Sequence, residues 1–176
     1  MQRTLFPLVC LVLGWFLGQD KPSGTDGSVP ADPLASLAPY VGGEWVAATF
    51  PAGSLTDIQR FEWICAKKFL RNTHEVQDST GKVVYSGETI YGYDVPTQTL
   101  RWWYFNATGG WIDGTVALED DGTLAHEGTN HAPPGQPARV RSSSKLDGEH
   151  WTSTTWFEKD GAWKVERELE YRKKPR

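Results

Sequence analysis

Two scarcities in this sequence of 176 residues limit the classes of protein it can belong to. It contains two cysteines, and Cys10 lies in an N-terminal segment that we expect to be removed, so we predict no intramolecular disulfide. The other, Cys65, is expected to be a small buried apolar residue. Positive charge is not in excess either, because the formal net charge is −4, and this argues against nucleic acid as a partner.

Catalytic and metal-binding motifs are also missing. The sequence has no nucleophile elbow, no phosphate-binding loop and no paired-carboxylate signature. His126 and His131 resemble a zinc motif, but that motif places two histidines at i and i+4 on a helix. At a spacing of five residues on a strand, the two rings would face opposite sides. We therefore predict neither a metal site nor a cofactor.

No apolar run has the length of about twenty residues that a membrane-spanning helix needs. The run Leu5–Gly18 follows Arg3 and ends abruptly at polar residues, which is typical of a secretory signal peptide over residues 1–18; an uncleaved anchor is the alternative. Residues 19–32 are rich in Gly, Pro, Ser and Asp and predict a disordered tether. Residues 33–174 then form one domain, secreted or periplasmic, with no transmembrane span in the mature protein.

The second half of the chain contains a regular series of glycines. Gly109, Gly122, Gly135, Gly148 and Gly161 recur every thirteen residues in turn-forming clusters, and the segments between them are rich in Trp, Thr, Val and Tyr. Asp-Gly and Gly-Gly pairs favour tight hairpins, so the pattern predicts an all-β antiparallel meander of about ten strands. The predicted strands are Glu44–Phe50, Asp57–Ile64, Lys68–Gln77, Val83–Asp94, Thr99–Asn106, Trp111–Glu119, Thr123–Asn130, Ala138–Leu146, His150–Glu158 and Trp163–Arg172.

A short helical turn is predicted near residues 33–40, directly before Gly43-Glu44-Trp45. Here the chain resembles the calycin superfamily, whose lipocalin-like members have Gly-x-Trp on the first strand after a short helix that closes one barrel end. The resemblance is to small, mostly bacterial calycin-like domains of unknown function. It covers roughly residues 34–174 and includes Phe61-Glu-Trp63, Lys68-Phe-Leu70, Ser86-Gly87, Gly92-Tyr-Asp94 and Tyr171-Arg172.

This resemblance implies a single antiparallel up-and-down β-barrel of about ten strands. It also implies that a basic side chain of the last strand, with Arg167 and Arg172 as candidates, packs over Trp45. It does not imply haem, because the glycine-rich haem-binding signature of nitrobindin-like barrels is missing.

Alternation along the last predicted strand indicates which residues lie inside the barrel. Every second residue from Trp163 to Tyr171 belongs to the less polar face, so Arg167 is predicted to point inward. Aromatic rows and one inward cation predict a pocket for a compound with an apolar body and an acidic or polar head. The predicted lining is Phe61, Trp63, Tyr91, Trp163 and Arg167. In the alternative interpretation, Arg167 closes the barrel by packing over Trp45.

The predicted strand Thr99–Asn106 has aromatic residues on both faces. One row should line the interior, and the other is either partly exposed or covered by the N-terminal segment, a partner subunit or a membrane surface. Three hypotheses follow. The domain binds a small, mainly apolar or amphipathic molecule inside the barrel, or it is an enzyme that uses an inward Glu, His or Arg for acid–base chemistry, or it is an interaction module or homodimer that uses the outer aromatic row.

Overall fold

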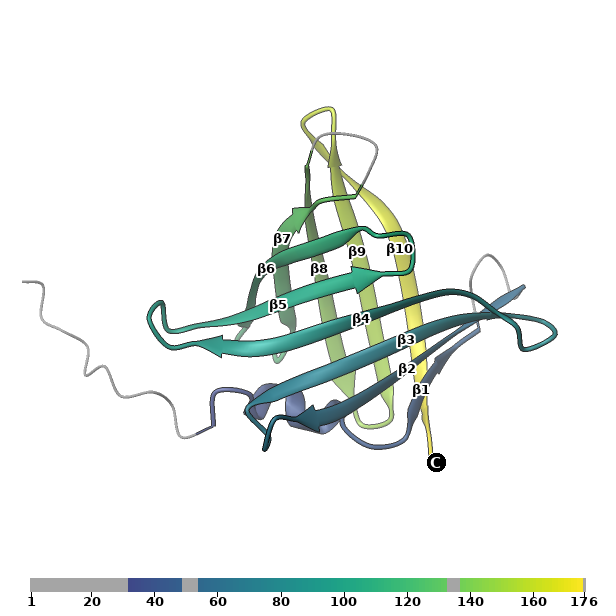
Figure 1. The fold of residues 1–176 in the computed structure, drawn as a ribbon, viewed down its shortest axis with the longest axis horizontal. Coiled ribbons are helices and arrows are strands. Elements are labelled where there is room, and N and C mark those ends of the chain that lie inside the picture. Colours follow the sequence, from purple (N-terminus) through teal and green to yellow (C-terminus); the bar gives the residue numbers. More distant parts are fainter. Residues whose placement is uncertain (1–31, 49–53, 133–136, 176) are drawn as a thin grey trace, which may run out of the picture.

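The computed structural model describes residues 32–48, 54–132 and 137–175, and about two thirds of these residues belong to β-strands (Figure 1). One 3₁₀ helix, η1 (Ala35–Tyr40), precedes ten strands. The strands are β1 (Glu44–Ala47), β2 (Leu55–Ile64), β3 (Phe69–Asp78), β4 (Val83–Asp94), β5 (Thr99–Asn106), β6 (Trp111–Leu118), β7 (Leu124–Asn130), β8 (Ala138–Asp147), β9 (His150–Lys159) and β10 (Ala162–Lys174).

The strands form a closed antiparallel barrel with up-and-down connections. Each strand pairs with its neighbours in the sequence, and β1 closes the barrel by pairing with β10. This confirms the predicted all-β, ten-strand barrel with a short N-terminal helical turn. The predicted signal peptide and nearly all of the predicted tether lie outside the described residues. Within the described ranges, no helix combines the length and the apolar character that crossing a membrane requires.

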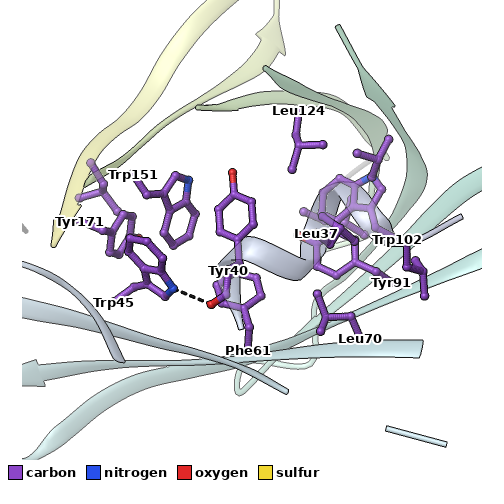
Figure 2. Close-up of a cluster of buried hydrophobic side chains, with 14 of the residues drawn as sticks. Leu37, Tyr40, Trp45, Phe61, Leu70, Tyr91, Trp102, Leu124, Trp151 and Tyr171 are labelled. Carbon is purple, nitrogen blue, oxygen red and sulfur yellow. Dashed lines mark hydrogen bonds between the residues drawn. The ribbon is translucent and has the colours of Figure 1, made fainter. Parts of the chain in front are cut away.

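Helix η1 packs into one end of the barrel (Figure 2). Its residues Leu37 and Tyr40 are buried, and the carbonyl oxygen of Tyr40 accepts a hydrogen bond of 2.8 Å from the indole nitrogen of Trp45. The cation above this indole is Lys173, whose Nζ lies 5.1 Å from the ring centroid. Arg167 was predicted for this position. Lys173 takes it because β1 and β10 pair Trp45 directly with Lys173, whereas Arg167 lies six residues away along β10.

A bulge in β10 changes which of its side chains face inward. The pairing of β10 with β9 shifts by one residue between Val165 and Arg167, and such a shift reverses the alternation of faces. Val165 is therefore 54% exposed, while Arg167 points into the barrel. Trp163, predicted to face inward, lies on the outer surface, where the guanidinium carbons of Arg139 and Arg141 lie 5.3 and 4.3 Å from its ring centroid.

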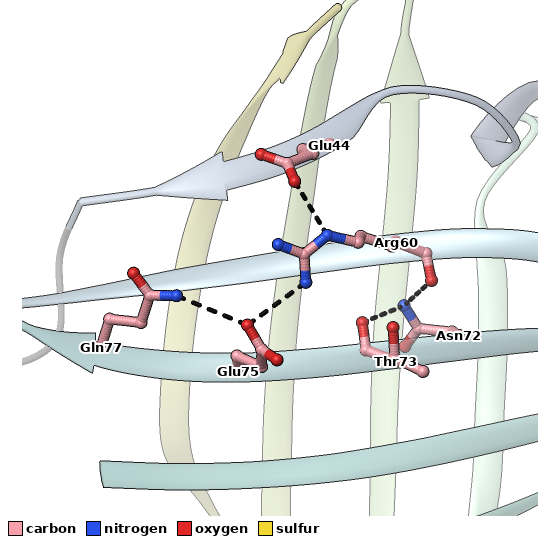
Figure 3. Close-up of polar contacts among 6 residues, drawn as sticks. All are labelled: Glu44, Arg60, Asn72, Thr73, Glu75 and Gln77. Atoms are coloured by element: carbon pink, nitrogen blue, oxygen red, sulfur yellow. Dashed lines mark hydrogen bonds and ion pairs between the residues drawn. The ribbon is translucent and has the colours of Figure 1, made fainter. Parts of the chain in front are cut away.

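Ion pairs on the outer surface connect the short strand β1 to its neighbours (Figure 3). Arg60 of β2 donates from Nε to Glu44 at 2.8 Å and from Nη1 to Glu75 of β3 at 3.3 Å. Half-exposed pairs of this kind contribute roughly 0–1 kcal/mol each. They help to align β1 in the barrel, while the stability of the closed end comes from the buried contacts of η1.

Cys65 is exposed, in contrast to the prediction that it is buried. Strand β2 ends at Ile64, and Cys65 begins the turn to β3. Its φ of 48° and those of Ala66 and Lys67 lie in the left-handed region, so the chain reverses direction here and turns this side chain out of the barrel.

Candidate functional site

The barrel contains a cavity of about 300 Å³. It is lined by inward-facing side chains of β2 to β10. Some of these residues, including Phe61 and Trp151, also belong to the buried cluster that contains Leu37 and Tyr40 of η1. Small-molecule sites have volumes of roughly 300–1,000 Å³, so this cavity is at the lower end of that range. Its size suits a compact molecule.

The cavity exists because two neighbouring strands present small side chains to the interior. Ser142 and Ser144 of β8 line it together with Ser153 and Thr155 of β9. The register pairs Ser142 with Thr155 and Ser144 with Ser153, so the four side chains form one continuous patch, which we call the hydroxyl wall. Large apolar residues at these positions would fill the space. Their small size leaves it open, and their hydroxyl groups make it partly polar.

Aromatic side chains form the opposite wall. Phe61, Tyr91, Trp102 and Tyr104 line the cavity from β2, β4 and β5. Tyr104 lies close against β4, because a Cβ atom on Gly87 would be 2.6 Å from its ring. These rings offer flat apolar surfaces with few polar atoms. A ligand would therefore contact aromatic carbon on one side and hydroxyl groups on the other.

The two ends of the cavity also differ in polarity. Phe61 and Trp151 belong to the buried cluster that includes η1, so the end near η1 is apolar. Asn106 and Asn130 are the last residues of β5 and β7 and line the opposite end, where Arg167 brings a positive charge. The cavity is thus amphipathic along the barrel axis.

A buried polar cluster lies next to Arg167. Gln59 Nε2 donates to the Tyr171 hydroxyl at 2.7 Å, and this hydroxyl donates to Asp57 at 3.3 Å. Burial raises the pKa of Asp57 to about 6, although the charge of Arg167 lowers it in part. His74 Nδ1 is 3.9 Å from Asp57, beyond hydrogen-bonding distance, and burial together with the charge of Arg167 lowers the pKa of His74 to about 4. His74 is therefore neutral at pH 7.

A second histidine lies deeper, among the aromatic rings. His126 Nε2 is 3.4 Å from the Tyr91 hydroxyl, and the His126 ring meets Trp102 edge to face at 5.4 Å. Burial lowers the pKa of His126 to about 4. No three His, Cys, Asp or Glu side chains among the described residues are grouped as ligands for a metal ion. The two buried histidines thus present neutral imidazoles to the cavity.

Three of the five residues predicted to bind a ligand line the cavity, namely Phe61, Tyr91 and Arg167. Trp63 does not line it and packs against the buried core, two residues further along β2 than Phe61. Trp163 lies on the outer surface because of the bulge in β10. The sequence prediction missed His74, His126 and the hydroxyl wall. The signal for the wall was present, since consecutive Ser and Thr residues occupy the middle of both strands, at 142–144 and 152–155.

The outer aromatic row of β5 is partly exposed. Phe105 is 48% exposed, and the guanidinium carbon of Arg101 lies 5.8 Å from the ring centroid of Trp103. Near this row, a shallow depression of about 350 Å³ is lined by Arg101, Arg139 and Trp163 among others. Charged and aromatic groups alternate here, and the surface is not a continuous apolar patch. This mixed character gives the interaction-module hypothesis less support than the cavity gives to binding.

Comparison with known proteins supports the fold. No protein-family model and no curated protein matches the sequence. Among solved structures, the chain is similar to the crystal structure of Rv2717c from M. tuberculosis, with a TM-score of 0.57 and 16% sequence identity over 82% of this chain and 98% of that chain. At this identity the likeness shows the fold alone. The calycin-like family assignment stays a prediction, and function has to be argued from the cavity.

Proposed function

We propose that this chain is an exported calycin-like barrel that binds a small amphipathic molecule in its interior. The apolar part of the molecule lies toward η1, and its polar or acidic group lies toward Arg167. The observation that carries this proposal is the cavity of about 300 Å³ with an aromatic wall, a hydroxyl wall and, among the described residues, one lining cation. A barrel that served only as a rigid scaffold would be expected to fill this space with side chains.

Of the mainly apolar and the amphipathic ligands predicted from the sequence, the lining favours the amphipathic one. The hydroxyl wall and the two neutral histidines offer several hydrogen-bonding groups, and burying them against a hydrocarbon would leave them without partners. Asp57 partly offsets the charge of Arg167 at pH 7, because its pKa of about 6 leaves it mostly ionised. One acidic group near Arg167 is therefore the most negative charge that this site should accept.

The test is calorimetric titration of the folded protein with a panel of aromatic and aliphatic carboxylates. Arg167→Leu should weaken binding by about 1.5–3 kcal/mol, the scale of a charge-assisted hydrogen bond, and Arg167→Lys should restore part of it. Arg172→Leu is the matched control, because Arg172 is an exposed residue of the same strand. Ser142→Phe should abolish binding by filling the cavity. Equal affinities in all four variants would refute interior binding.

Acid–base catalysis on a bound molecule is the second candidate, favoured by the proximity of Asp57, His74 and Tyr171. Two features make it weaker. His74 is a poor base because its pKa is lowered to about 4, and Asp57 is not among the residues that line the cavity. Turnover of a bound ligand that is lost in His74→Gln, with binding retained, would favour the enzyme.

A further inference from the structure

The hydrogen bonds of three buried tryptophans reveal a more specific property of the site. Trp45 donates its indole N–H to the carbonyl of Tyr40 at 2.8 Å, and Trp102 donates its own to the carbonyl of Glu127 at 3.3 Å. The indole nitrogen of Trp151 is buried as well, but no acceptor among the described residues is within hydrogen-bonding distance. Buried donors without a partner are rare in native proteins and destabilise the fold, so this one needs an explanation.

Packing holds the Trp151 ring in place. The ring stacks on Tyr171 at 4.1 Å with an interplanar angle of 15°, and it meets Tyr40 and Trp45 edge to face at 5.4 and 5.9 Å. Only 6% of the residue is exposed. A ring enclosed in this way cannot turn to find another acceptor. The missing partner therefore has to come to the indole nitrogen.

Trp151 lines the cavity, so a bound molecule would lie against its ring, and a small shift of the neighbouring side chains would give that molecule access to the indole nitrogen, which has almost no accessible surface. Figure 2 shows the indole nitrogen on the side of the ring away from Trp45. An indole N–H is a donor only, and the partner must therefore be an acceptor. Ser153, two residues further along β9, and Ser144, its cross-strand partner, place hydroxyl groups on the same inner face. A ligand hydroxyl group could accept a hydrogen bond from the Trp151 indole and donate one to a serine oxygen, so it would give both protein groups a partner.

We propose that the ligand has a second polar group at its inner end, a hydroxyl that accepts a hydrogen bond from Trp151 Nε1. This inference rests on the proposed function and makes it more specific. With an acidic group near Arg167 and aromatic rings between the two ends, the ligand class is a compact aromatic hydroxy acid. A fatty acid lacks an acceptor at the position facing Trp151 and would leave the donor without a partner.

Calorimetric titration with three probes tests this inference. The probes are 3-(4-hydroxyphenyl)propanoate, 3-phenylpropanoate, which lacks only the hydroxyl, and nonanoate, which lacks the ring. The wild-type protein should bind the hydroxylated probe about tenfold more tightly than 3-phenylpropanoate, as expected for one hydrogen bond to a buried donor. Nonanoate should bind more weakly than either aromatic probe.

Two tryptophan variants separate the N–H group from the ring. Trp151→Phe keeps an aromatic ring, removes the donor, and should abolish the tenfold preference while changing the affinity for 3-phenylpropanoate less than threefold. Trp102→Phe is the matched control, because its N–H is already bonded to Glu127. It should weaken both aromatic probes equally and leave the preference intact.

A direct readout is the indole ¹H–¹⁵N resonance of Trp151 in the wild-type protein, which should move downfield with the hydroxylated probe only. If both aromatic probes bind with equal affinity, the proposed function stands and the hydroxyl inference is overturned. If none of the three probes binds, both fall. If Trp151→Phe does not fold, the resonance alone decides, and a signal that is the same with both aromatic probes overturns the inference.

Discussion

Acidification from pH 7 to pH 4 should destabilise this barrel, because it protonates histidines that the fold buries in neutral form. Burial lowers the pKa of His74 and His126 to about 4, from about 6.5 in the unfolded chain. The stability that these groups contribute is complete above pH 6.5 and is lost as the pH falls toward 4. Asp57 acts in the opposite sense. Burial raises its pKa to about 6, so it favours the folded state increasingly as the pH falls from 6 toward 3.8.

The size of the effect follows from the shifts. One pKa unit corresponds to about 1.4 kcal/mol, so each histidine costs about 3 kcal/mol of stability at pH 4 and Asp57 returns about 3 kcal/mol. From these three groups, the net loss is about 3 kcal/mol. Domains of this size are stable by roughly 5–15 kcal/mol, and the loss is therefore a large fraction of the total.

Urea unfolding followed by circular dichroism at pH 7.5 and pH 4 measures the loss. Asp57→Asn should be at least as stable as the wild type at pH 7.5 and should lose about twice as much on acidification, because the compensating group is gone. His126→Gln should lose about 3 kcal/mol less than the wild type. A free energy of unfolding that is equal at both pH values in the wild type and in Asp57→Asn would refute the reasoning.

Two substitutions test the packing of the barrel, both by urea unfolding. Trp45→Ala should lower the free energy of unfolding by about 3–5 kcal/mol, since it removes a side chain with no exposed surface and the hydrogen bond to Tyr40. Trp111→Ala is the control, because Trp111 is 39% exposed. An equal loss in both variants would contradict the role of η1 in closing the barrel. Gly114→Ala should cost at least about 2 kcal/mol, because a Cβ atom there would lie 1.9 Å from the carbonyl oxygen of Glu127. An unchanged midpoint for this variant would mean that β6 and β7 can separate without loss.

The order of the strands could be predicted because it depends on local chemistry. Four of the five glycines in the thirteen-residue series lie within the described residues, and Gly109, Gly122, Gly148 and Gly161 all have positive φ, between 57° and 82°. Hairpins that need this conformation, separated by alternating strands, favour neighbouring antiparallel pairing. A meander that closes on itself forms a barrel. The position of the helical turn at one end of the barrel was predicted from the resemblance to calycin-like domains.

The composition of the site could be predicted only in part. It depends on the register of strands that are distant in the sequence, and on inward positions where small side chains leave space. The choice of Lys173 over Arg167 as the partner of Trp45 is set by the pairing of two strands more than a hundred residues apart in the sequence. Ser144 and Ser153 look like ordinary strand residues until β8 and β9 are paired, and only then do they form a wall that leaves room for a molecule. Periodicity shows which face is buried but not which positions leave space.

The bulge in β10 also bears on how such barrels diversify. Glu166 is the extra residue of the bulge. Because of it, the inward and outward positions of β10 before the bulge are out of phase with those after it. Loss of that one residue would restore regular pairing between β10 and β9, and it would leave Trp163 outside, Arg167 inside and the pairing of Trp45 with Lys173 unchanged. A one-residue difference in length at this point can thus be absorbed without changing the cavity lining or the closure of the barrel. Sequence comparisons that slide by one position here would equate residues that lie on opposite sides of the barrel wall.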